Sequence, residues 1–164
     1  MKQIWAPWRM SYIQGSGEKT KACVFCVGKD RDEDRERLIL FRGQKAFVIM
    51  NRFPYTNGHL MIAPYRHTAK TEDLSDAEAL EMHRLLVMSN KALQDCCAPH
   101  GFNIGMNLGQ VAGAGIADHL HLHIVPRWSG DTNFMPVFAD VRVIPQHLEE
   151  TYEILLKSFS GRQP

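Results

Sequence analysis

Long hydrophobic runs are missing from this 164-residue sequence, and their absence excludes one class of protein. No apolar stretch reaches the roughly 20 residues that a transmembrane helix needs. Residues 1–9 contain Trp, Pro and Arg, which interrupt the apolar core that a secretory signal peptide requires. We therefore expect a cytoplasmic protein without a membrane partner.

The sequence also lacks an excess of charge of either sign. The sequence has 19 Lys and Arg residues against 18 Asp and Glu residues, and its formal net charge is +1. Charge therefore gives no indication of nucleic-acid or membrane-surface binding, and we expect neither. A hydrophobic content of 45% and a charged content of 23% are ordinary for a globular protein, and the length suits one domain with a real core.

Only four cysteines occur, in two close pairs. Cys23 and Cys26 form a Cys-x-x-Cys motif, and Cys96 and Cys97 are neighbours. In a reducing compartment such a motif more often binds a metal or performs redox chemistry than forms a disulfide, and the motif alone leaves these two open. Cys96 and Cys97 end a helical pattern and are expected to be small thiols, buried or half-buried.

What the sequence does contain is a stretch, residues 119–125, in which histidines alternate with aliphatic residues. Strict alternation predicts a β-strand, with His119, His121 and His123 on one exposed face and the aliphatic side chains on the other. A single strand histidine is usually a polar surface residue, but three beside a Gly-rich loop favour chemistry. Imidazole suits nucleophilic, acid–base or metal-binding work near neutral pH.

The rest of the pattern predicts an α+β domain with an antiparallel sheet, because short turns join the strands and the helices are segregated. Ser75 and Glu78 fit a capping box at the start of one long helix, and a C-terminal helix is expected within 145–159. Residues 1–22 are predicted to form an arm and linker, and residues 23–164 a single domain. Further strands are predicted over residues 38–41, 46–50, 59–63, 102–108 and 137–144. The core stripe of the long helix is predicted to contain Ala77, Leu80, Leu85, Met88, Ala92 and Leu93.

The histidine stretch resembles the His-φ-His-φ-His-φ-φ signature of the histidine triad (HIT) family. The preceding Gly-rich segment 113–118, the following segment 126–128 and the Trp-rich leader 4–9 resemble the branch that holds the fragile histidine triad protein and bacterial diadenosine tetraphosphate phosphorylases. The resemblance covers residues 4–146, most of the chain. It implies a HIT-like fold, with a five-stranded antiparallel sheet, one long helix and a C-terminal helix, in a homodimer.

The resemblance also assigns catalytic roles. Family members attack phosphorus with the middle histidine and form a nucleotidyl-histidine intermediate, which implies that His121 is the nucleophile. A neutral imidazole can attack if its other nitrogen is held by an acceptor. His123 is expected to donate a hydrogen bond to the charge that develops on the phosphate oxygens.

Nucleotide binding is expected from the segment that leads into the triad. Small residues let backbone N–H groups approach phosphate oxygens, so Gly113 and Gly115 are predicted phosphate ligands, although by itself the loop would read as a plain flexible connection. The resemblance places Asn107 at the phosphates and Asn51 at the ribose. A turn-initiating Asn is the alternative for Asn51. His59 resembles the fourth histidine that supports the family's active site.

A metal site is a separate expectation. Some HIT proteins close a Cys-x-x-Cys zinc site with a histidine after a strand-end proline and the first triad histidine. Here the resemblance implies that Cys23, Cys26, His67 and His119 bind one structural zinc ion. Mg²⁺ is expected only as a companion of the substrate.

The function implied is cleavage of a dinucleoside polyphosphate such as diadenosine tetraphosphate. Water as acceptor would release AMP, whereas phosphate as acceptor would give ADP and ATP. The branch resemblance favours phosphate, although the sequence does not reveal how a site chooses between the two. One alternative is a purine nucleoside phosphoramidase of the histidine-triad nucleotide-binding type, but that branch usually has a hydroxyl residue where this chain has Ile116 and Ala117. A non-catalytic nucleotide-binding protein is the other alternative.

Overall fold

A computed structural model describes residues 23–28, 31–131 and 146–164. Within them, five strands form one sheet in the order β1-β2-β3-β5-β4, and every neighbouring pair is antiparallel. Its α+β class and five strands confirm the predicted architecture. The strands are β1 (Ile39–Arg42), β2 (Ala46–Met50), β3 (Leu60–Pro64), β4 (Gly101–Met106) and β5 (Leu122–Arg127).

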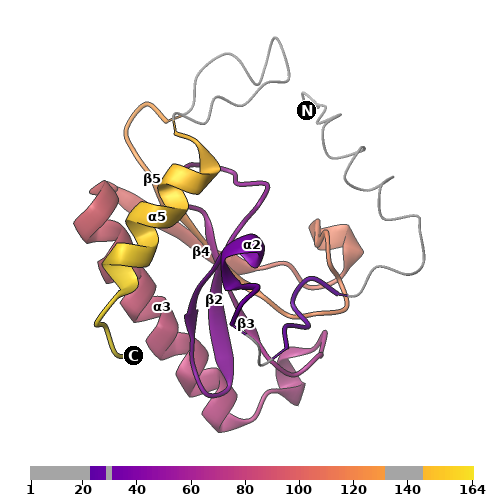
Figure 1. The fold of residues 1–164 in the computed structure, drawn as a ribbon. Helices are drawn as coiled ribbons and strands as arrows, with labels where there is room; N and C mark the ends of the chain where they lie inside the picture. Colours follow the sequence, from indigo (N-terminus) through magenta and orange to yellow (C-terminus); the bar gives the residue numbers. More distant parts are fainter. Residues whose placement is uncertain (1–22, 29–30, 132–145) are drawn as a thin grey trace, which may run out of the picture.

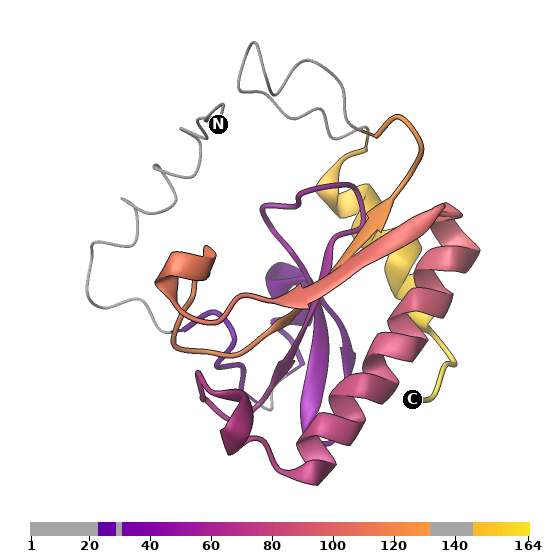
Figure 2. The same cartoon turned by 180° about the vertical axis from the view of Figure 1, so that it is seen from behind.

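Two long helices cover one face of this sheet, as Figures 1 and 2 show from opposite sides. They are α3 (Asp76–Cys97) and α5 (Leu148–Phe159), and they pack on each other as well as on the strands. The described residues also form the short helix α2 (Asp34–Arg37) and the 3-10 turns η2 (Thr71–Asp73) and η3 (Gln110–Ala112).

The two faces of the sheet have different cores because side chains alternate along each strand. On the helix side, Val48, Met50 and Ile62 pack against α3 and α5. On the opposite side, Phe47, Ile49 and other apolar residues pack around Phe25. The larger apolar cluster lies on the helix side, which leaves the opposite face of the sheet as the place for a functional site.

Helix α3 begins as predicted. The Ser75 hydroxyl accepts a hydrogen bond from the Glu78 backbone N–H at 3.3 Å, and the Glu78 carboxylate accepts one from the Ser75 N–H at 2.8 Å. The predicted core stripe is wrong at its first turn, where Ala77 is exposed and Leu80 is 52% exposed. Met82 is buried instead, because the side of the helix that faces the sheet is rotated relative to the predicted stripe.

The predicted histidine strand is too long at its N-terminal end. Pairing with β3 and β4 begins only at Leu122, so His119 and His121 precede β5. The backbone there binds a loop instead: the Leu120 N–H donates to the Thr68 carbonyl at 2.6 Å. The predicted arm (1–22) and strand (137–144) lie outside the described residues.

The C-terminus of α3 offers a test of the backbone geometry. Ala98 caps this helix in the left-handed region, at φ 43°. We expect Ala98→Gly to raise the free energy of unfolding by about 0.5–1 kcal/mol, since glycine avoids the Cβ clash of this conformation. The exposed helical residue Ala79 is the control, because Ala79→Gly should lower stability by about 1 kcal/mol. Equilibrium urea denaturation measures both, and a destabilised Ala98→Gly would contradict the expectation.

Candidate active site and metal cluster

The register of the sheet places the third histidine of the triad on the face opposite the helices. His123 pairs with Met61 of β3 and Gly105 of β4, and Met61 in turn pairs with Ile49. Paired residues point to the same face, so His123 shares a row with the apolar residues of that side. A Cβ built on Gly105 would meet nothing within 4 Å, which leaves open space beside the His123 ring.

The central histidine is held by one backbone hydrogen bond. His121 Nδ1 lies 2.8 Å from the carbonyl oxygen of His119. Because a carbonyl oxygen only accepts, Nδ1 carries the hydrogen and Nε2 has a lone pair. No hydrogen bond within the described part of the chain occupies Nε2. In its neutral form, His121 therefore has its unprotonated nitrogen at Nε2, where it can act as a nucleophile.

His123 has the opposite tautomer, set by a chain of hydrogen bonds. The Tyr55 backbone N–H donates to His59 Nδ1 at 3.1 Å, and the Asn51 side-chain amide lies 3.2 Å from the same nitrogen. His59 Nε2 must then carry the hydrogen and donate it to His123 Nδ1, 2.9 Å away. His123 Nε2 consequently carries a hydrogen, and this buried atom has no partner among the described residues.

The two histidines stand edge to face, with ring centroids 4.7 Å apart and planes at 74°. Burial lowers the pKa of His121, against the opposing effect of its bond to His119. Burial, with a smaller contribution from His121, lowers the pKa of His123 to about 4. The pair thus offers a lone pair on one ring and an N–H donor on the other, with no positive charge at neutral pH.

The expectation of an exposed histidine face is wrong. His119 and His121 are 0% and 6% exposed, because the Cys23–Cys26 turn folds over them. The Phe25 ring of this turn lies with its centroid 4.6 Å from that of His121 and 5.4 Å from that of His119. Phe25 is a site residue that the sequence analysis missed, and its position between the two cysteines was the available indication.

Beside the triad, four side chains converge on one point. The potential ligand atoms of Cys23, Cys26, His67 and His119 all lie within 4.8 Å of one another. His67 Nδ1 is 3.2 Å from Cys26 Sγ, and His119 Nδ1 is 3.5 and 3.8 Å from the two sulfurs. The structure therefore brings together all four predicted metal ligands, from segments far apart in the sequence.

The tautomer of His119 matches a ligand role. Its Nε2 lies 2.9 Å from the Pro64 carbonyl oxygen, which leaves the lone pair on Nδ1, the nitrogen that faces the sulfurs. Burial, and then the neighbouring Cys23, raise the pKa of the Cys26 thiol. A cation bound at this point would stabilise the Cys26 thiolate and so favour its deprotonation.

A family model described as the HIT domain matches residues 33–130. The chain is also 37% identical over 171 residues to a Mycobacterium tuberculosis protein named AP-4-A phosphorylase, with 100% of this chain and 87% of that protein covered. This chain belongs to the HIT domain family.

Two other HIT proteins extend the comparison. A Schizosaccharomyces pombe adenosine 5′-monophosphoramidase is 28% identical over 106 residues, which cover 65% of this chain and 74% of that protein. A zinc-bound histidine triad family protein from Mycobacterium smegmatis superimposes with a TM-score of 0.64 at 24% identity, covering 85% of this chain and 94% of the other. At this identity the structural match supports the fold alone.

The predicted nucleotide-binding residues of this HIT chain have different surroundings in the structure. The Asn51 side-chain amide lies next to His59 Nδ1, and its side-chain oxygen accepts a hydrogen bond from the Phe53 N–H at 2.9 Å. The second bond is the geometry of a turn-initiating Asn, the alternative expected for this residue. Asn107 directly follows β4, and continuation of the β4–β5 register would set it beside His121. Gly113 follows η3 with a backbone φ of 87°, a conformation that requires glycine. Gly115 is exposed.

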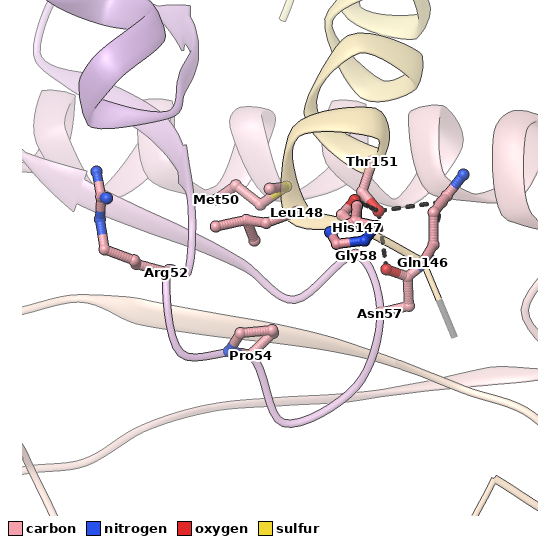
Figure 3. A pocket seen from close by; sticks show the side chains of 9 residues that line it. All are labelled: Met50, Arg52, Pro54, Asn57, Gly58, Gln146, His147, Leu148 and Thr151. Carbon is pink, nitrogen blue, oxygen red and sulfur yellow. Dashed lines mark hydrogen bonds between the residues drawn. The ribbon is translucent and has the colours of Figure 1, made fainter. Parts of the chain in front are cut away.

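A cavity of about 420 Å³ lies away from the triad. Figure 3 shows it between the 50–58 loop and the start of α5. Met50 and Leu148 line it and also pack in the helix-side core, so it opens on the other face of the sheet. Three polar side chains of its wall bind one another, since the Thr151 hydroxyl lies 2.9 Å from Asn57 Oδ1 and 3.0 Å from Gln146 Oε1.

The loop that carries the predicted metal ligand His67 is tied to α3 by an ion pair that the sequence analysis missed. Arg66, next to His67, binds the Glu78 carboxylate at 2.8 and 3.0 Å. Hydrogen bonds from Arg66 and from the Ser75 backbone lower the pKa of Glu78 to about 2. This carboxylate therefore anchors both the helix start and the loop that carries His67.

This anchor predicts a pH dependence of stability. A carboxylate whose folded pKa is depressed stabilises the fold above its unfolded pKa, and this contribution is lost as the pH falls toward the folded value. We expect the stability difference between the wild type and Glu78→Gln to be full at neutral pH and to shrink between about pH 5 and pH 3. Urea denaturation across this range measures it, and parallel curves for the two proteins would contradict the expectation.

Proposed function

We propose that this HIT protein cleaves dinucleoside polyphosphates through a nucleotidyl intermediate on His121. One observation carries the proposal: the His121 lone pair and the His123 N–H come from backbone-fixed tautomers on adjacent rings. In the reaction, His121 Nε2 attacks the α-phosphorus, the P–N bond forms, and the anhydride oxygen leaves with the bond electrons. Water or phosphate then takes the nucleotidyl group from His121.

His123 acts in this scheme as a fixed donor. Its Nε2–H stabilises negative charge that builds on the phosphate oxygens, in a buried position where such a bond is strong. The hydrogen-bond chain behind it runs through His59 to the Tyr55 backbone N–H and the Asn51 amide, which keeps the hydrogen of His123 on Nε2. A phosphoanhydride leaving group needs no protonation, so a donor that only stabilises charge suffices for a polyphosphate substrate.

Phosphate as acceptor is our preferred second step, because the M. tuberculosis relative is named a phosphorylase and matches the whole chain. Asn107, Gly113 and Gly115 are proposed to bind the phosphates, and Asn51 the ribose. His59 and Asn51 keep His123 in its donor tautomer. Mg²⁺ with the substrate stays a prediction.

Substitution of the nucleophile tests the mechanism. We expect His121→Ala to lower turnover of diadenosine tetraphosphate by roughly 10⁴-fold or more, because the covalent step is lost. Brief incubation of labelled substrate should leave label on the wild type and none on the variant. His100, an exposed histidine outside the site, is the control, and His100→Ala should keep full activity.

Product analysis decides the acceptor. ADP and ATP formed only with added phosphate would support phosphorolysis, whereas AMP formed without phosphate would support hydrolysis. Turnover by His121→Ala equal to that of the wild type would remove the nucleotidyl-histidine mechanism. Nucleotide binding without turnover in the wild type would favour the non-catalytic alternative.

We also propose that Cys23, Cys26, His67 and His119 bind one structural zinc ion. Tetrahedral zinc with ordinary bond lengths places sulfur and nitrogen ligands about 3.6 Å apart, close to the 3.2–3.8 Å between the sulfurs and ring nitrogens here. When bound, zinc would supply a structural cross-link. The chain's own residues prepare the site, since Pro64 orients His119 and the Arg66–Glu78 pair fixes the loop of His67.

Metal analysis tests this site. Purified wild type should contain close to one zinc ion per chain, and Cys23→Ser should lose it together with some thermal stability. Cys96→Ser is the matched control because its thiol lies elsewhere, at the end of α3, and it should keep the zinc. Wild type without zinc after expression in zinc-supplemented medium would overturn the assignment.

A homodimer and a cytoplasmic location stay predictions. No helix in the described ranges combines the length and apolar character needed to cross a membrane. Strand β4 lies at one edge of the sheet, and its Ile104 side chain is 44% exposed. An edge strand with exposed apolar side chains is a surface on which a second copy can add its own strand.

A further inference from the structure

Phe25 connects the metal cluster to the nucleophile. It lies between Cys23 and Cys26 and is 1% exposed. Its ring is inclined by only 31° to the His121 ring, with the centroids 4.6 Å apart, and it also contacts the His119 ring. One aromatic side chain therefore covers both the histidine of the metal cluster and the histidine proposed to attack phosphorus.

The His121 ring needs such a contact because one hydrogen bond alone does not fix it. The terminal torsion of histidine is soft, so the ring can turn about its bond to Cβ. A turn would break the bond from Nδ1 to the His119 carbonyl and move Nε2 away from its present direction. The tilted Phe25 ring at contact distance restricts this rotation, since the edge of the turning imidazole would collide with it.

Phe25 is itself held in place from several sides. The turn that carries it is closed by a hydrogen bond of 3.0 Å from the Cys26 N–H to the Cys23 carbonyl. The ring packs in the histidine-side core with Phe47, Ile49 and other apolar residues. A metal ion in the proposed site would join both flanking cysteines to His119 and so clamp the ring against the triad.

We propose that Phe25 is a positioning residue, whose ring holds the His121 imidazole with Nδ1–H on the His119 carbonyl and the Nε2 lone pair toward the substrate. The proposal rests on the proposed function where it concerns turnover. Its structural part, the orientation and tautomer of His121, is independent of any substrate. The variable residues of the Cys-x-x-Cys motif therefore have unequal roles here.

The neighbouring residue provides the matched control. Val24 lies in the same turn between the same cysteines, but its side chain is 51% exposed. We expect Val24→Ala to behave as the wild type. Phe25→Leu fills much of the same volume with an apolar group but removes the flat face, so the His121 ring gains rotational freedom.

Two measurements on the full-length, zinc-loaded protein test the proposal. We expect Phe25→Leu to lower kcat by about 10- to 100-fold while KM changes by less than about three-fold, because the nucleophile is misplaced and substrate contacts remain. In nuclear magnetic resonance spectra of protein with ¹⁵N-labelled histidine, the wild-type His121 should show a single Nδ1–H tautomer. The variant should show a mixture of tautomers, and Phe25→Met serves if Phe25→Leu does not fold.

The outcomes separate this proposal from the proposed function. A His121 spectrum in Phe25→Leu identical to that of Val24→Ala would overturn it. So would loss of zinc from Phe25→Leu together with the same altered His121 spectrum in zinc-free wild type, because the metal and not the ring would then orient His121. If the wild type cleaves no dinucleotide, the proposed function fails, but the spectra still decide the role of Phe25.

Discussion

The hydrogen bond from His121 Nδ1 to the His119 carbonyl is the interaction on which the site depends. At 2.8 Å from an atom that cannot donate, Nδ1 must carry the hydrogen, and Nε2 must keep its lone pair. The same residue, His119, turns its own side chain toward the two cysteines. Its backbone thus holds the proposed nucleophile, and its ring faces the proposed metal ligands.

The two faces of the sheet have different roles: one carries the larger apolar core, and the other carries the histidines. Its helix side buries the larger apolar cluster under α3 and α5 and keeps the strands in register. That register sets His123 opposite Gly105, where the missing side chain leaves room beside the ring. The histidine side is closed by the short Cys23–Cys26 turn, whose buried Phe25 packs with Phe47, Ile49 and other apolar residues of the sheet.

Local pattern was sufficient for the elements with one strong preference. Strand β2 has the predicted bounds, and the capping box of Ser75 and Glu78 starts α3, because both are determined by residues close in sequence. Leu80 was misplaced because helical spacing does not say which of two adjacent stripes meets the sheet. The histidine strand was predicted too long because alternation continues through His119, where the chain pairs with the Thr68 loop instead.

For the functional site too, some features follow from the sequence and others only from the tertiary structure. The sequence by itself indicated the side chains proposed to carry the chemistry, three alternating histidines and two spaced cysteines, because imidazole and thiol groups are rare in such patterns without a role. Only the tertiary structure decided their protonation and burial. The tautomers of His121 and His123 follow from the His119 carbonyl and the Tyr55 N–H, backbone groups that any sequence possesses. Where a backbone group points depends on the folded path of the whole chain, and this is why no spacing rule could supply it.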